Sequence, residues 1–459
     1  MAGIGYALEK LIKRDDLLGT FQGYSIGAII STGPWLFTIV SLMGINFLVN
    51  NWVEISQITN FRIILIYNYS FSLVLTGPVI LIATRYLADG IYNKSIESSP
   101  SMLLIALGIT YIIGMLSILP FYTFFVELSL VLKIAAISNY FLVASVWVVS
   151  IFLTALKDYK AYIFIYAIGM GISFFSSLFF ASNYGTSGLL FGFNLGLTVI
   201  VFSTIARVFS EYPYMFQWPA SFLPYFKKYW ELSIGGLLFA AAIWIDKWIM
   251  WFAPEREITA GVLIYHADYD VAMFLAYLSI IPAMALFLVS SETGFNKKYQ
   301  EYYSCIKNHA PFSIISSKHQ NMVNFLSINF RNIFILQGAI CILTIILTPQ
   351  IIHYFGGHYL QLGMLRLGIL GAFFHILFLF ISTIFMYFDL RRINFTLLVL
   401  FLLLNGLFSY LSMQSGYEYY GYGYFLATLL TFIISLIVLV KVLNKLPYYT
   451  FIKNNLSAN

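Results

Sequence analysis

The feature that most constrains this chain is a series of twelve apolar segments, each long enough to cross a membrane. A membrane-spanning helix needs about 20 mainly apolar residues. Because backbone groups cannot stay unpaired in hydrocarbon, each segment is predicted to be helical. The predicted spans are 21–49, 61–87, 101–124, 130–156, 159–181, 185–208, 230–252, 271–291, 331–355, 363–388, 393–413 and 421–446.

Composition excludes the other broad classes of protein. Hydrophobic residues make up 60% of the sequence and charged residues only 10%, whereas a soluble domain carries about 25% charged residues. The formal net charge of +6 is too small to indicate nucleic acid as a partner, so the lipid bilayer is the expected surrounding. The predicted fold class is an all-α membrane protein.

The basic residues predict the orientation of the spans. With the N-terminus in the cytoplasm, the inner segments carry all but five of the 25 Lys and Arg residues. The exceptions are Arg62, Lys133, Lys247, Arg256 and Arg366. Since basic residues gather in cytoplasmic loops, the N- and C-termini are both expected in the cytoplasm.

The loop 209–229, which contains three prolines and the pair Lys227-Lys228, divides the spans six and six. Span 1 contains Ser25-Ile26-Gly27 and span 7 contains Ser233-Ile234-Gly235 at a similar depth. We therefore expect two six-helix lobes related by a pseudo-twofold axis along the membrane normal. The expected parts are an amphipathic cytoplasmic segment at 1–20, an N-lobe at 21–208, a cytoplasmic linker at 209–229, a C-lobe at 230–446 and a cytoplasmic tail at 447–459. Within the C-lobe, the polar loop 292–330 predicts either amphipathic helices on which a partner docks or a solvated linker.

Proline steps near the middle of several spans predict a substrate path. Proline removes a backbone donor and clashes with the preceding turn, so a helix kinks or opens there. Exposed carbonyls are tolerated where they line a cavity, although simple packing kinks are the alternative. The residues concerned are Ser31, Thr32, Gly33, Pro34 and Trp35 in span 1, Thr76, Gly77 and Pro78 in span 2, and Pro282 in span 8.

Charged residues inside spans are further candidates for this path, because they are costly in lipid and usually face an interior or a wet cavity. Asp246 and Lys247 adjoin in span 7, and as helical neighbours they are expected to have partners elsewhere. Arg85 and Asp89 fit an i, i+4 pair at the inner end of span 2, and Glu292 lies at the corresponding end of span 8.

Three other patterns have simpler interpretations. Gly188, Gly192 and Gly196 predict close helix packing on span 6. A tyrosine group at the outer start of span 12 predicts an interfacial belt, with sugar stacking as the alternative; it comprises Tyr417, Tyr419, Tyr420, Tyr422 and Tyr424. The outer-loop residues His266, Asp268 and Asp270 alternate like weak metal ligands, but no fourth ligand is in view.

No nucleophile elbow, nucleotide-binding loop or zinc-protease signature occurs in the sequence. We therefore expect no enzyme activity, no cofactor and no metal. Energy would come from an ion gradient, the membrane potential or a coupled cytoplasmic reaction.

Several stretches resemble the PelG family of membrane transporters for the Pel exopolysaccharide, within the multidrug/oligosaccharidyl-lipid/polysaccharide flippase superfamily. The similarity extends over nearly the whole chain. The stretches are Met1-Ala2-Gly3-Ile4-Gly5-Tyr6, Leu8-Glu9-Lys10-Leu11, Ile30-Ser31-Thr32-Gly33-Pro34-Trp35, Thr76-Gly77-Pro78, Thr84-Arg85-Tyr86-Leu87-Ala88-Asp89, Ile243-Trp244-Ile245-Asp246-Lys247, Glu292-Thr293 and Tyr387-Phe388-Asp389.

This resemblance implies two six-helix lobes around a central cavity. It also implies export of a hexosamine-rich, Pel-type polysaccharide chain across the bacterial plasma membrane. The implied partners are a cytoplasmic UDP-sugar-dependent glycosyltransferase and other Pel membrane subunits under cyclic-di-GMP control.

Three alternatives to polysaccharide export stay open on the sequence. A flippase for a lipid-linked oligosaccharide requires cations that grip pyrophosphate, and the spans offer few. An ion-coupled antiporter for small cations would use Asp246 as its proton or sodium site. A scaffold without transport activity, or a membrane-bound polymerase, is the third.

Overall fold

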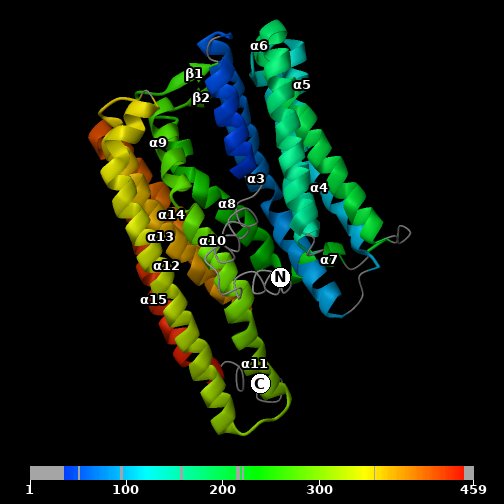
Figure 1. Ribbon diagram of the computed structural model, residues 1–459, viewed down its shortest axis with the longest axis vertical. Helices are drawn as coiled ribbons and strands as arrows, with labels where there is room; N and C mark the ends of the chain where they lie inside the picture. Colours follow the sequence, from blue (N-terminus) through cyan, green and yellow to red (C-terminus); the bar gives the residue numbers. More distant parts are fainter. Residues whose placement is uncertain are drawn as a thin grey trace, which may run out of the picture. The chain divides into compact units, whose positions relative to one another are not determined.

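The computed structural model describes residues 36–49, 52–93, 97–155, 159–212, 218–219, 222–355 and 357–448, without the side chains of 153–155, 159–160, 292–293 and 448. Helices dominate this part of the chain (Figure 1). Ten of them are long and apolar enough to cross a membrane, as expected for apolar runs that must satisfy their own backbone groups. The described chain divides into two compact units. One boundary between them falls within helix α8, where Trp244 belongs to the first unit and Ile245 to the second.

The first unit contains the helix Leu36–Val49 and most elements before residue 245. Its further helices are α3 (Ile55–Tyr92), α4 (Ser99–Pro120), the π-helical turn η1 (Phe121–Phe125), α5 (Leu130–Ala155), α6 (Tyr159–Glu211), α7 (Phe222–Lys228) and the beginning of α8 (Trp230–Met250).

Helix α6 contains both predicted spans 159–181 and 185–208, which are separated at Gly185. Gly185 has a φ of 53°, a left-handed conformation that glycine adopts without a steric penalty. The two halves then pack antiparallel, because a Cβ on Gly192 would lie 2.3 Å from the nitrogen of Ser177 and one on Gly196 would lie 2.1 Å from the carbonyl oxygen of Gly169. This confirms close packing by the glycines of span 6.

Three buried asparagines connect the helices of the first unit. Asn68 of α3 donates to Asn139 of α5 at 2.9 Å, and Asn139 donates to Asn194 of α6 at 2.8 Å. Tyr122 donates to the side-chain oxygen of Asn68 at 2.9 Å. Such a chain satisfies buried amides that would otherwise destabilise the fold.

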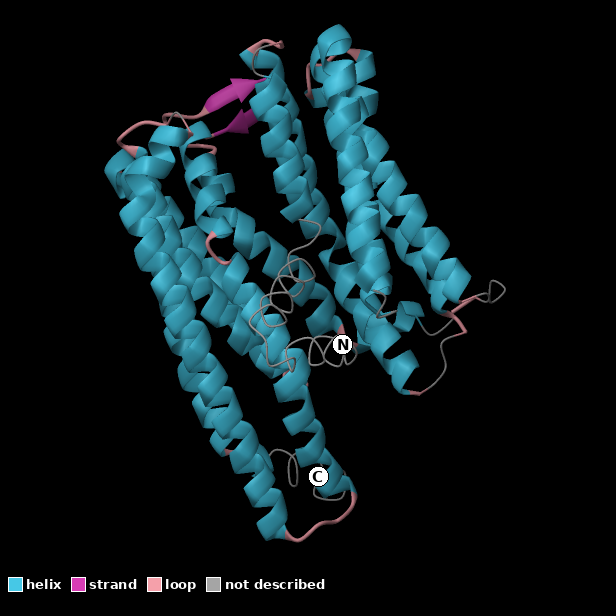
Figure 2. Cartoon of the chain, viewed as in Figure 1, coloured by secondary structure: helices cyan, strands magenta, loops and turns pink. Residues whose placement is uncertain are grey.

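A short β-hairpin follows α8 and belongs to the first unit. Strands β1 (Glu257–Thr259) and β2 (Leu263–Tyr265) pair antiparallel, with Ile258 opposite Ile264. They are the two strands of the described residues (Figure 2). The Tyr67 hydroxyl of α3 accepts from the Ile264 amide at 2.9 Å and donates to the Ile264 carbonyl at 2.8 Å. From the sequence, an outer loop without strands was expected at this position.

The second unit contains Ile245–Met250 of α8 and the elements after residue 266. These elements are α9 (Ala267–Leu278), α10 (Ile281–Ser290), the π-helical turn η2 (Ser291–Phe295), α11 (Asn296–Lys307), α12 (Phe312–Tyr354), α13 (Gln361–Tyr387), α14 (Arg391–Ser415), the 3-10 turn η3 (Tyr417–Tyr419), α15 (Tyr422–Asn444) and α16 (Leu446–Tyr448).

Helix α13 forms the core of the second unit, and it packs against α9, α12 and α15. The loop predicted at 292–330 is helical: η2, α11 and the first part of α12 occupy it. Figure 1 shows α11 and the beginning of α12 as a hairpin that projects from the rest of this unit. Tyr302 of α11 is fully buried, so this hairpin is packed rather than a solvated linker.

Candidate functional site

The structure describes only some of the predicted path residues. Ser31, Thr32, Gly33, Pro34 and Trp35 lie outside the described residues, as does the side chain of Glu292. Pro282 lies in the first turn of α10, directly after the break that separates α9 from α10. The interruption predicted in span 8 is therefore present.

Thr76, Gly77 and Pro78 lie inside α3, which stays helical through the proline. The Thr76 hydroxyl donates to the carbonyl of Ser72 at 2.7 Å within the same helix. Gly77 meets Gly236 of α8: a Cβ on Gly77 would lie 2.5 Å from the Gly236 carbonyl oxygen. Gly77 is thus required for a close approach of two helices, as small residues commonly are in membrane proteins.

Arg85 and Asp89 form the predicted i, i+4 ion pair near the C-terminal end of α3, with a nitrogen–oxygen distance of 3.2 Å. Tyr225 of α7 donates to Asp89 at 3.2 Å. The Arg85 guanidinium lies 5.0 Å from the centre of the Tyr229 ring. We call these four residues together with Tyr86 the Arg85 cluster.

The tyrosines of the Arg85 cluster stand edge to face or tilted toward one another. The ring centres of Tyr86 and Tyr225 are 5.1 Å apart, as are those of Tyr225 and Tyr229. Burial, together with the Asp89 carboxylate, raises the pKa of Tyr225, so its phenol stays a donor at neutral pH. Lys228 lies 5.1 Å from the Tyr229 ring centre. The cluster therefore combines aromatic faces, a cation and a carboxylate, with Lys228 as a second cation beside it, and Arg85 and Asp89 are both partly exposed.

Asp246 and Lys247 lie in the part of α8 that belongs to the second unit. Asp246 is fully buried and Lys247 is 7% exposed. The ammonium of Lys247 lies 3.1 and 3.2 Å from the two carboxylate oxygens of Asp246. The expectation that these neighbours have partners elsewhere holds only in part, because the long lysine side chain also folds back onto the preceding residue.

Four further residues complete the surroundings of this ion pair. Tyr269 donates to Asp246 at 3.1 Å, and the ring centres of Tyr277 and Tyr424 lie 5.0 and 5.9 Å from the Lys247 ammonium. The hydroxyls of these two tyrosines lie 3.3 and 2.9 Å from Nδ1 of His375. None of these four residues was predicted from the sequence to lie beside the ion pair. His375 carried a signal, since it is an ionisable residue inside an apolar span.

Of the tyrosines predicted to form an interfacial belt, Tyr419 and Tyr422 are exposed, whereas Tyr420 and Tyr424 are buried inside the protein and do not fit such a belt. Asp268, one of the possible metal ligands, accepts hydrogen bonds from Tyr417 at 2.7 Å and from Gln361. Among the described residues, no three His, Cys, Asp or Glu side chains gather as metal ligands.

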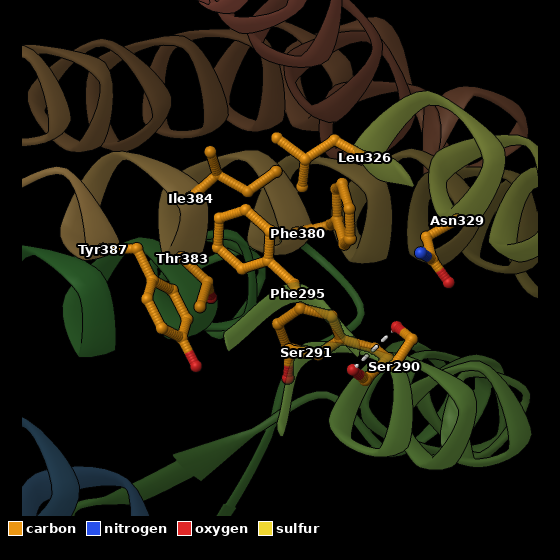
Figure 3. A pocket seen from close by; sticks show the side chains of 10 residues that line it. Ser290, Ser291, Phe295, Leu326, Asn329, Phe380, Thr383, Ile384 and Tyr387 are labelled. Atoms are coloured by element: carbon orange, nitrogen blue, oxygen red, sulfur yellow. Dashed lines mark hydrogen bonds between the residues drawn. The ribbon is translucent and has the colours of Figure 1, made fainter. Parts of the chain in front are cut away.

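A narrow pocket in the second unit lies beside η2 (Figure 3). The pocket has room for roughly one water molecule. Phenyl rings and hydroxyls line it, and Ser290 donates to the Phe287 carbonyl at 3.2 Å. A sugar does not fit there. The lining residues are Phe287, Ser290, Ser291, Phe295, Leu326, Asn329, Phe380, Thr383, Ile384 and Tyr387.

Solved structures with the same fold are transporters. A crystal structure of a MATE protein with a single substitution matches with a TM-score of 0.62 and 13% identity, covering 97% of this chain and 99% of that one. "Outward-facing conformation of a multidrug resistance MATE family transporter of the MOP superfamily" has a TM-score of 0.60 and 14% identity, covering 92% and 96%. A MOP superfamily transporter from Pyrococcus furiosus has a TM-score of 0.61 and 13% identity, covering 96% and 97%. The predicted fold class, an all-α membrane protein with two six-helix lobes, is confirmed.

No curated protein sequence matches the chain. The family PelG, described as "Putative exopolysaccharide Exporter (EPS-E)", matches residues 1–451. This match covers both units, and together with the fold it identifies a multi-pass membrane transporter. The resemblance that the sequence motifs indicated is therefore confirmed, and the chain belongs to the PelG family.

Proposed function

We propose that this transporter exports a hexosamine-rich, Pel-type polysaccharide across the bacterial plasma membrane, with both termini in the cytoplasm. The family match over residues 1–451 is the observation that carries this proposal. A cytoplasmic UDP-sugar-dependent glycosyltransferase would supply the chain, and other Pel membrane subunits would complete the assembly. The two lobes of the transporter would be residues 21–208 and 230–446.

The Arg85 cluster is the substrate contact that the chemistry of the described residues supports best. Tyrosine rings offer flat apolar faces to the C–H faces of a pyranose, while their hydroxyls stay hydrogen-bonded. Arg85 and Asp89 supply charged donors and acceptors for sugar hydroxyl, amide and amine groups. Because the cluster is only partly buried, a sugar reaches it without unfolding a helix.

Translocation by the purified transporter tests this proposal. The protein is reconstituted into vesicles with its glycosyltransferase, UDP-sugar is added on the side of the enzyme, and polymer is measured on the other side. We expect translocation that depends on both proteins. Equal translocation with an unrelated membrane protein in place of the transporter would refute export.

Variants then test the Arg85 cluster itself. Tyr225→Ala removes a ring from the cluster and the hydrogen bond to Asp89, so translocation should fall at least several-fold while polymer synthesis is unchanged. Tyr92→Ala is the matched control, because Tyr92 ends α3, the helix of Arg85 and Asp89, but is 82% exposed. Equal translocation by both variants would remove the cluster from the substrate path.

A lipid-linked oligosaccharide is the second candidate substrate, and one observation favours it. Arg85 and Lys228 both approach the ring of Tyr229, at 5.0 and 5.1 Å, and a pair of cations beside one ring is a possible ligand set for a pyrophosphate. An experiment with the same vesicles, loaded with a pyrophosphate-linked oligosaccharide and without glycosyltransferase, distinguishes between the two substrates. Translocation in that experiment would favour the flippase.

A further inference from the structure

The ion pair in the second unit has the composition of a cation site. A carboxylate is the ligand that hard monovalent cations prefer, and tyrosine ring faces attract cations through the ring quadrupole. Here the Asp246 carboxylate and the ring faces of Tyr277 and Tyr424 surround one ammonium group. We call these three groups the tethered-cation site.

The rings of this site are held in place by a second layer of contacts. The hydroxyls of Tyr424 and Tyr277 both lie within hydrogen-bonding distance of Nδ1 of His375. His375 is itself 1% exposed. These contacts restrict the movement of both rings, so that the ring faces stay directed at the ammonium.

The burial of this ion pair argues against an ordinary packing role. Removing two charges from water is energetically costly, and apolar residues of the same size often replace a buried pair without loss of stability. The cost is larger in a membrane, where ionisable residues usually serve function. A lone Asp246 would need a proton or a cation from solution, and Lys247 supplies a positive charge that cannot diffuse away.

We propose that Lys247 is a built-in cation that permanently fills the tethered-cation site. The second unit then neither takes up nor releases a sodium ion at Asp246 during transport. The ligand of the site is a monovalent cation, either an alkali ion or a primary alkylammonium. A cation from solution can occupy the site once the lysine amine has been removed. This inference goes beyond the assignment of a polysaccharide substrate and holds for any cargo.

Thermal unfolding of the purified protein in detergent tests the proposal. Chlorides of lithium, sodium, potassium and methylammonium are titrated, with N-methylglucamine chloride keeping the ionic strength constant. The wild-type midpoint temperature should not change with any of these ions. Lys247→Ala should unfold at a lower temperature and recover by a few degrees, in a saturable way, with methylammonium or an alkali ion.

Two variants serve as controls. Asp246→Asn/Lys247→Ala should lose the recovery, because the anionic ligand is gone. Lys441→Ala removes an exposed lysine from α15 and should behave like the wild type.

Three results would overturn the built-in cation. One is a wild-type midpoint that rises saturably with lithium, sodium or potassium and loses this response in Asp246→Asn. Another is a folded Lys247→Ala that responds to no cation. The third is a Lys247→Ala that is obtained only unfolded in every salt while the double variant folds. If neither variant folds, the wild-type titration decides alone.

Discussion

Gly77 of α3 and Gly236 of α8 meet backbone against backbone, so that a Cβ on Gly236 would lie 2.3 Å from the carbonyl oxygen of Gly77. Real Cβ atoms are not found that close to a carbonyl oxygen, and a backbone does not yield as a flexible side chain does. The approach of these two helices within the first unit therefore depends on both residues lacking a side chain.

Gly77→Ala or Gly236→Ala should force the two helices apart. Overpacking of this kind costs about 1–3 kcal/mol, so the midpoint of thermal unfolding should fall. Gly108→Ala is the matched control, since nothing lies within 4 Å of a Cβ at that position of α4. Equal midpoints for Gly77→Ala and Gly108→Ala would contradict the close contact.

Asn139→Ala should destabilise the first unit. The substitution leaves the side-chain oxygen of Asn194 without the donor that lies 2.8 Å away, and a buried unsatisfied polar group costs about 1–3 kcal/mol. Denaturation of the purified protein measures the loss. Asn324→Ala, at an exposed position of α12, is the control and should unfold like the wild type.

Tyr67→Phe should loosen the β-hairpin while preserving the core. The phenylalanine keeps the ring, whose centre lies 4.7 Å from that of Trp251, but it removes both hydrogen bonds to Ile264. Hydrogen exchange at the Ile264 amide should become at least several-fold faster. The same change at Tyr359, which is 85% exposed, should leave that amide protected, and unchanged exchange in Tyr67→Phe would refute the anchoring role.

Acid should weaken the packing of α11 on α12. Lys318 lies 3.0 Å from Glu301, and its hydrogen bond lowers the pKa of Glu301 below the ordinary value, with Lys298 adding to the effect and partial burial opposing it. Because the pKa is depressed in the folded state, the stabilisation is present at neutral pH and disappears as the pH falls through the folded-state pKa.

The comparison of wild type with Glu301→Gln measures this contribution. Their unfolding midpoints should differ slightly near pH 7, since the ion pair is partly exposed, and should converge below the ordinary carboxyl pKa of about 4.3. A difference that persists or grows in acid would contradict the prediction.

Tyr265, in contrast, should not titrate in the physiological range. Burial and its hydrogen bond to Glu257 raise the pKa of Tyr265 to about 12. The phenol therefore keeps its proton, and hairpin exchange should be constant between about pH 6 and 9 after correction for the intrinsic rate.

The helices were predictable because the length of an apolar run and its bounding turns determine a membrane span. The reversal at Gly185 is an example: spans 159–181 and 185–208 were separated correctly, although their helices nearly join. The β-hairpin was not predictable, because each strand has only three residues and cannot show an alternating pattern. The turn between the strands, where Ala260 and Gly261 both have positive φ, offers only a weak local signal in the sequence.

The surroundings of Asp246 were harder to predict for a different reason. The rule that residues i and i+1 point apart describes where side chains begin on a helix, not where a lysine of four methylene groups ends. Tyr424 and His375 come from helices far along the chain, and only tertiary packing brings them together. One such contact is at Gly371, where a Cβ would lie 2.4 Å from the ring of Tyr424.

Helix α12 begins in the projecting hairpin and continues for 43 residues, a length of about 65 Å at the usual rise per residue. It is unbroken between Lys318 in the hairpin and Cys341 in the predicted span 331–355. Because no break separates the hairpin from residues 331–355, we expect a displacement of the hairpin to move the predicted span of the same helix as well.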